Sequence, residues 1–268
     1  MAGLFDRDYL ALTEEEIQEK KRIDLEDAHV AGARFGRTDF YYKYPKAVRY
    51  WMSLFPNNYM DPKFLKESEE IERQCDEFEE LLENESTKES DVKNFIQGKG
   101  YYHIPASIFK YYHFGHHDAY LFKEFKLGTE YIADYVLVGK SSDGFEFVFV
   151  EFENPYKNIV IGDGDFGNTI RKGINQVNDW HSFILSNYPT ITEEFKKNTD
   201  VAIHTLPDEF YTLDPTRIHY VVVAGRREDY QEKTRRLKRK LKEDSDILII
   251  HYDNLLDKSR ELIGNNTY

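Results

Sequence analysis

The chain of 268 residues contains one cysteine, Cys75, and no long apolar segment. A single cysteine cannot form an intrachain disulfide, and it excludes zinc ribbons and Cys-X-X-Cys redox sites. No run approaches the roughly 20 apolar residues of a membrane helix. Residues 1–8 have neither the basic start nor the apolar core of a secretion signal. We therefore expect a soluble, cytoplasmic protein without a membrane partner.

Several nucleotide-binding and hydrolase motifs are also missing. The sequence has no Gly-X-X-X-X-Gly-Lys-Ser/Thr loop for a nucleoside triphosphate, no dinucleotide fingerprint after a strand and no Gly-X-Ser-X-Gly elbow. These absences argue against NTP-driven and serine-hydrolase chemistry.

The chain lacks a surplus of positive charge, since 49 Asp/Glu outnumber 36 Lys/Arg and the formal net charge is −13. Proteins that coat nucleic acid depend on Lys and Arg to replace counterions, so this balance argues against indiscriminate binding. Residues 226–242 are an exception, with nine Lys/Arg and three Asp/Glu. Such a stretch is typical of a solvated helix face, and it also suits a local surface that contacts phosphates.

Aromatic residues are abundant, with 20 Tyr and 19 Phe, which predicts a compact fold. Residues 1–85 are predicted to form an acidic, mainly helical N-terminal region. Its aromatic cluster at 40–44 and 50–51 suits core packing or stacking on bases. The amphipathic helix at 67–83 is expected to pack on the core or on another subunit.

A β-hairpin is the most informative feature. Residues 131–138 and 145–153 are rich in Val, Ile, Phe and Tyr, and the Gly/Ser/Asp segment between them supplies turn residues. Because side chains alternate along a strand, Glu151 and Glu153 share a face, roughly 6.6 Å apart. A turn centred on Ser142-Asp143 places Asp134 opposite Glu151, and one centred on Asp143-Gly144 places it opposite Glu153. A three-residue loop would place Asp134 opposite Phe152 and separate the acids.

Adjacent acids need compensation, because two like charges about 4 Å apart repel by about 4 kcal/mol even at an effective dielectric near 20. A solvated sheet edge is the ordinary explanation. A divalent cation is the alternative, because Mg²⁺ prefers oxygen ligands and is usually held by one or two carboxylates. Glu151 follows an apolar run, and Asn154-Pro155 ends the strand shortly after it. Both features favour the divalent cation.

Two helices flank the hairpin. Glu89 begins a helix and lies on the side of its apolar face, and Gln176 adjoins the apolar stripe of a helix at about 169–186. Strands at 218–224 and 247–252 alternate with a helix at 226–243. The predicted fold is therefore α/β, a mixed central sheet flanked by helices with an N-terminal mainly helical extension.

The order of the candidate residues resembles the PD-(D/E)XK nuclease core, which is the restriction-endonuclease-like fold. These residues are Glu89, Asp134, Glu151-Phe-Glu153 and Gln176. Within that superfamily the stretches 89–96, 127–137, 148–155 and 176–180 are most similar to the Shedu-type anti-phage defence nucleases. The resemblance covers about residues 86–252. It implies a nuclease-like domain at 86–268 and a regulatory or oligomerisation role for residues 1–85.

The resemblance implies a Mg²⁺-dependent endonuclease that hydrolyses phosphodiesters, with Mn²⁺ as a possible substitute, in defence against phage or foreign DNA. Asp134, Glu151 and Glu89 would bind the metal, Glu153 would act beside them, and Gln176 would orient the site. The implied partners are nucleic acid, DNA in preference to RNA, and further copies of the chain in a homo-oligomer.

One departure from the superfamily pattern is Glu153, where a lysine is usual. Glu153 is suited to act as a general base through water or to hold a second metal, and Lys157 and Lys172 are near enough in sequence to supply the missing cation. The alternative hypothesis is a catalytically silent nuclease-like module that binds nucleic acid or a protein partner as a sensor. Strand cleavage in repair or transposition is a third.

Overall fold

The computed structural model describes residues 4–29, 49 and 53–268. The aromatic cluster at 40–44 and 50–51 lies outside the described residues. None of the described helices is both long and apolar enough to cross a membrane.

The central element is a five-stranded mixed sheet in the order β1-β2-β3-β6-β7. The first three strands are antiparallel, and β6 and β7 continue the sheet parallel to β3. A separate two-stranded sheet is formed by β4 and β5. The strands are β1 (Asp118–Leu127), β2 (Tyr131–Ser141), β3 (Gly144–Phe152), β4 (Val160–Ile161), β5 (Asp165–Phe166), β6 (Ile218–Val223) and β7 (Ile247–Ile250).

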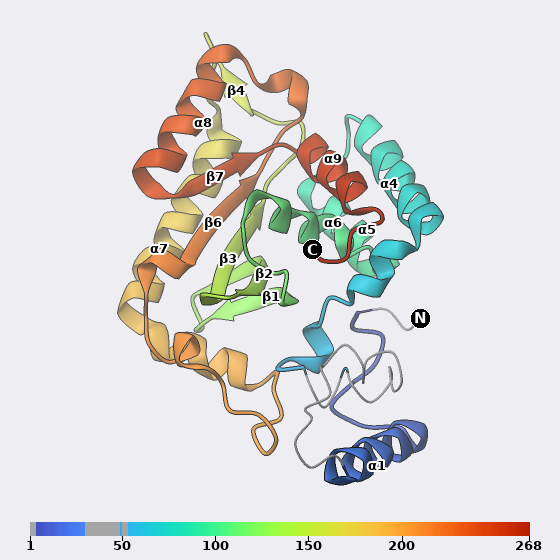
Figure 1. The fold of residues 1–268 in the computed structure, drawn as a ribbon. Coiled ribbons are helices and arrows are strands. Elements are labelled where there is room, and N and C mark those ends of the chain that lie inside the picture. Colours follow the sequence, from blue (N-terminus) through green and yellow to red (C-terminus); the bar gives the residue numbers. More distant parts are fainter. Residues whose placement is uncertain (1–3, 30–48, 50–52) are drawn as a thin grey trace.

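Helices cover both faces of the sheet (Figure 1), with α7 and α8 on one side and α4, α5, α6 and α9 on the other. The α-helices are α1 (Glu14–His29), α4 (Ser68–Glu83), α5 (Glu89–Lys99), α6 (His103–Ala106), α7 (Asn168–Lys196), α8 (Glu232–Ser245) and α9 (Tyr252–Leu262). Short 3₁₀ turns lie at Pro56–Asn58, Pro62–Lys66, Ser107–Tyr111, Asp208–Phe210, Pro215–Arg217 and Arg227–Asp229. This architecture confirms the predicted fold class.

The sheet separates two hydrophobic clusters because its side chains alternate between faces. Val136 and Phe149 belong to the cluster under α7, and Leu137 and Val150 belong to the cluster that α4, α5 and α9 complete. The helix predicted at 67–83 is α4, and its buried face packs into this second cluster, mainly against α9. The sequence left that partner open, and the structure places it within the same chain.

Several elements differ from the predictions. The helix predicted at 226–243 is α8, which begins only at Glu232. Strand β1 was not predicted, yet it pairs with β2 over most of its length. Helix α7 extends past the predicted end to Lys196, with non-helical backbone angles at Asn187, just before Pro189. The last strand ends at Ile250, and Tyr252 begins α9 instead of closing that strand.

Candidate functional site

The β2–β3 hairpin sets the geometry of the site. The register pairs Tyr135 with Val150 and Ser141 with Gly144, so Ser142 and Asp143 form the turn. Gly144 has φ +106°, a conformation that favours glycine. Continued by one residue, this register places Asp134 opposite Glu151, which is the first of the two predicted arrangements.

Both opposed acids are buried. Asp134 is 9% exposed and Glu151 is 3% exposed. The Phe152 N–H donates a 2.9 Å hydrogen bond to Oδ2 of Asp134, so a side chain takes the place of the next ladder bond and fixes the carboxylate against β3. The pKa of Asp134 is raised because burial outweighs the opposing effect of Lys93.

Glu151 is the least compensated acid of the group. Its Oε2 is buried and makes no hydrogen bond within the described part of the chain. Burial, followed by the charges of Asp134 and Glu153, raises the pKa of Glu151 to about 9. A buried acceptor without a partner costs about 1–3 kcal/mol, so this carboxyl group is held at a cost to the fold.

Helix α5 brings a third acid to the hairpin together with a lysine. Glu89 is the first residue of α5, and Lys93 lies one turn later. Nζ of Lys93 donates to Oε1 of Glu89 at 2.8 Å and to Oδ1 of Asp134 at 2.9 Å. Lys93 therefore joins the predicted acids of α5 and β2.

Glu153 lies just beyond the end of β3 and is tied to its neighbours by both main-chain groups. Its N–H donates to the carbonyl of Val223 at 2.8 Å, and its carbonyl accepts from the Tyr252 hydroxyl at 2.7 Å. The Glu153 side chain is 3% exposed, and Nζ of Lys172 lies 2.9 Å from Oε1 and 3.0 Å from Oε2. Burial raises the pKa of Glu153, and Lys172 opposes that rise.

Of the two lysines predicted as substitutes for the missing cation, Lys172 on α7 lies beside these acids. Lys172 also lies 3.9 Å from Oε2 of Glu89, so it faces two acids of the group. Lys157, the other predicted substitute, makes no ion pair with these acids in the described residues; its N–H instead donates to the side chain of Asn154.

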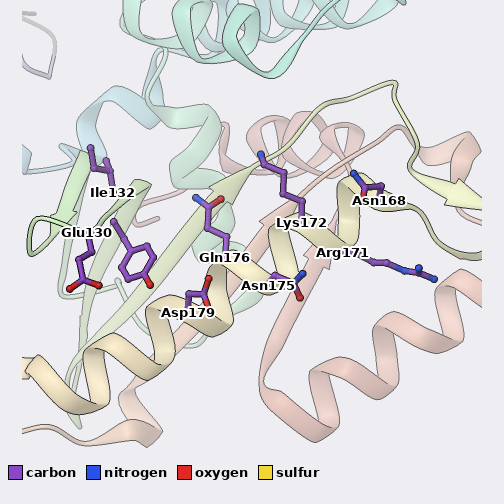
Figure 2. Close-up of a pocket in the computed structure, with 9 residues that line it drawn as sticks. Glu130, Ile132, Asn168, Arg171, Lys172, Asn175, Gln176 and Asp179 are labelled. Atoms are coloured by element: carbon purple, nitrogen blue, oxygen red, sulfur yellow. The ribbon is translucent and has the colours of Figure 1, made fainter.

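Gln176 lies one helical turn after Lys172 and projects to the same side of α7 (Figure 2). Both line an open cavity of about 580 Å³, together with Asn168, Arg171 and Asn175 from α7 and residues 130–132 from the start of β2. No hydrogen bond joins Gln176 to the acids among the described residues. Gln176 is therefore beside the acid group, on the wall of the adjoining cavity.

Gly173 explains how α7 packs so close to β6 and to the end of β3. A Cβ atom at this position would lie 2.6 Å from Cγ1 of Val222 and 3.1 Å from Cγ of Glu153. Glycine therefore allows the helix to approach β6 and the end of β3, which brings Lys172 within reach of Glu153.

The donor set suits a hard cation. Lys93 bridges Glu89 and Asp134, Glu151 lies opposite Asp134, and among the described residues Oε2 of Glu151 has no hydrogen-bond partner. Mg²⁺ prefers carboxylate oxygens of this kind. Among the described residues, however, no three acidic, His or Cys side chains already surround one point as ligands. Lys93 occupies Oδ1 of Asp134, so cation binding requires that lysine to move.

A comparison with protein families supplies an independent finding. The family described as Shedu protein SduA, C-terminal, matches residues 77–256, about two thirds of the chain. The chain belongs to this Shedu family. The region of the Shedu chain that matches runs from α4 to α9 and contains all five predicted site residues. Membership suggests a role in anti-phage defence. A search of curated proteins found no match.

Sequence reasoning missed Lys93 in this Shedu chain. Its spacing from Glu89 is i, i+4, which is the spacing at which an acid and a lysine meet on a helix. That local signal was present, but only the packing of α5 against the hairpin brings Lys93 to Asp134.

Proposed function

We propose that this chain is a Mg²⁺-dependent nuclease that hydrolyses phosphodiester bonds of DNA in defence against phage or foreign DNA. We further propose that residues 86–268 form a PD-(D/E)XK-type domain, and that residues 1–85 regulate or oligomerise it. The single observation that supports the activity is the buried pair Asp134 and Glu151, in which Oε2 of Glu151 has no hydrogen-bond partner among the residues that the structure describes.

In this proposal each acid has a distinct task. Asp134 and Glu151 would hold the cation, and the Phe152 N–H fixes Asp134 for that role. Glu89 would add a third carboxylate from α5. When bound, Mg²⁺ would polarise the scissile phosphate and lower the pKa of a water molecule beside it, which a general base could then deprotonate.

Glu153 acts on the proton of the attacking water, and Lys172 acts on the negative charge of the phosphate. A raised pKa suits Glu153 for accepting a proton from an attacking water. Lys172 lies beside it and is the cation available to stabilise negative charge on the phosphate. Gln176, one turn further along α7, is placed to orient a strand that enters the adjoining cavity.

The test is cleavage of linear, circular and single-stranded DNA, and of RNA, in EDTA, Mg²⁺ or Mn²⁺. We expect divalent-dependent cleavage of DNA that falls at least about 100-fold in Asp134→Asn and Glu151→Gln, the scale of losing one main electrostatic contact. Glu85→Gln, an exposed acid outside the site, is the matched control. Cleavage that continues unchanged in EDTA, or in both site variants, would contradict the proposal.

A second candidate is the silent nuclease-like module that senses nucleic acid or a protein partner. The observation that favours it is the pair of lysines, Lys93 and Lys172, which already neutralise Glu89, Asp134 and Glu153. Calorimetric titration with Mg²⁺ separates the two candidates. Binding of the metal without cleavage of any substrate form would support the silent module.

A further inference from the structure

A second cavity, of about 210 Å³, lies where α8 meets the start of α9. Its lining includes four cationic side chains and two rings, namely Arg227, Arg235, Lys238, Arg239, Tyr230 and His251. No carboxylate of the described residues lines it. The cavity is therefore a concentrated region of positive charge on a chain whose net charge is −13.

Two of these cations lack an acidic partner. Among the described residues no ion pair is formed by Arg235 or Lys238, whereas Arg227 pairs with Asp257 and Arg239 lies 3.4 Å from Glu232. Nζ of Lys238 lies over the ring of Tyr230, 5.1 Å from its centroid. Burial, followed by the charges of Arg235 and Arg239, lowers the pKa of Lys238 to about 8. An anion in the cavity would relieve this repulsion.

The wall of the cavity is firmly built. Tyr230 is 4% exposed, its hydroxyl donates to the carbonyl of Ala224 at 2.7 Å, and its ring lies 5.3 Å from that of His251. His251 is buried and is the N-cap of α9. Asp253, the acid in the first turn of α9, is already bound by Nη2 of Arg226 and the N–H of Arg227, each at 2.8 Å. Asp253 is thus held by Arg226 and Arg227, and its Oδ2 lies 3.5 Å from Nδ1 of His251.

These features fit a tetrahedral oxyanion. Guanidinium groups bind phosphate oxygens through paired N–H donors, lysine adds a point charge, and a helix start favours negative charge. We infer that the α8–α9 cavity, formed around Arg235 and Lys238, binds a phosphate group at a site separate from the acids of β2 and β3. Its source is either a free phosphate compound or the phosphodiester of a strand that runs along α8.

The cavity is structurally connected to the acid group. Tyr252 follows His251 and donates to the carbonyl of Glu153 at 2.7 Å. A phosphate held at His251 therefore lies one residue away from a side chain that fixes the end of β3.

The test compares two double variants with the same change of charge on the same helix. Arg235→Gln with Lys238→Met removes cations that line the cavity; Arg236→Gln with Lys240→Met removes exposed cations that do not. Each protein is titrated in EDTA with inorganic phosphate by calorimetry, and with fluorescent single-stranded DNA by anisotropy. Thermal unfolding checks the fold, and Arg235→Gln alone is used if the double variant is unfolded.

We expect the cavity variants to weaken binding at least about 10-fold in one or both titrations, as loss of a charge-assisted phosphate contact implies, against less than about 3-fold for the control pair. An effect with inorganic phosphate identifies a free phosphate compound as a ligand, and an effect with DNA alone identifies a strand phosphate. Equal losses in both pairs, or no binding of either probe by the wild-type chain, would overturn the inference. Because EDTA prevents metal-dependent cleavage, this result is independent of the nuclease assay.

Discussion

Nζ of Lys93 lies 2.9 Å from Oδ1 of Asp134, the carboxylate oxygen that the Phe152 N–H leaves free. A lysine from α5 therefore occupies the place at which the proposed cation would bind β2. In the metal-free state Lys93 compensates the negative charge of Asp134. It must leave Asp134 when a metal binds there.

Removing Lys93 should weaken the metal-free fold. In Lys93→Met we expect the free energy of unfolding in EDTA to fall by about 2 kcal/mol, because a buried carboxylate loses its partner. Lys88→Met, an exposed lysine just before α5, is the control. Denaturant unfolding measures the difference, and equal stability of the two variants would show that Lys93 does not stabilise the site. In the same variant, Mg²⁺ should bind more tightly, since no ammonium competes for Oδ1.

Glu151→Gln should make the metal-free protein more stable at pH 8. The folded-state pKa of Glu151 is about 9, above its ordinary 4.5, so between these values the folded chain binds more protons than the unfolded chain. The contribution of Glu151 to stability therefore falls as pH rises through that window. We expect the substitution to add about 1–3 kcal/mol at pH 8, which is about 2–5 °C in Tm for a chain of this size.

The check is thermal unfolding in EDTA at several pH values between 5 and 9. Glu85→Gln should leave the pH dependence unchanged, and Glu151→Gln should flatten it. If the stability of Glu151→Gln follows the wild-type curve at every pH, the pKa of Glu151 is not raised in the folded protein.

Lys172 should matter for cleavage, whereas Lys157 should not. Lys172→Met removes the only lysine that contacts Glu153 within the described residues, and we expect cleavage to fall about 10- to 100-fold with Mg²⁺ saturating. Lys157→Met carries the same change of charge and should remain within about 3-fold of wild type. Single-turnover cleavage rates provide the comparison, and the reverse order of effects would transfer the role to Lys157.

Gly173→Ala and Gly98→Ala should change the free energy of unfolding in opposite directions. A methyl group at 173 would meet Val222 and Glu153, so we expect a loss of about 1–3 kcal/mol from overpacking. A methyl group at 98, within α5, meets nothing within 4 Å and should add about 0.5–1 kcal/mol through helix propensity. Denaturant midpoints measure both changes. Equal tolerance at the two positions would mean that the approach of α7 does not depend on Gly173.

The sequence by itself determined the hairpin, because strand composition and turn residues are local signals. It limited Asp134 to a position opposite Glu151 or Glu153, and the register chose Glu151. It also predicted the order of Glu89, the hairpin acids and Gln176, and the mixed sheet between helices. These features depend on spacing along the chain, which the sequence states directly.

Only the tertiary structure decided which cations meet the acids and which charges share a cavity. Lys93 reaches Asp134 because α5 packs beside the hairpin, and Lys172 reaches Glu153 because Gly173 lets α7 approach β6. Arg235 and His251 line one cavity because β7 returns the chain to the sheet between α8 and α9. Long-range packing sets such distances, and no pattern in a single sequence encodes them.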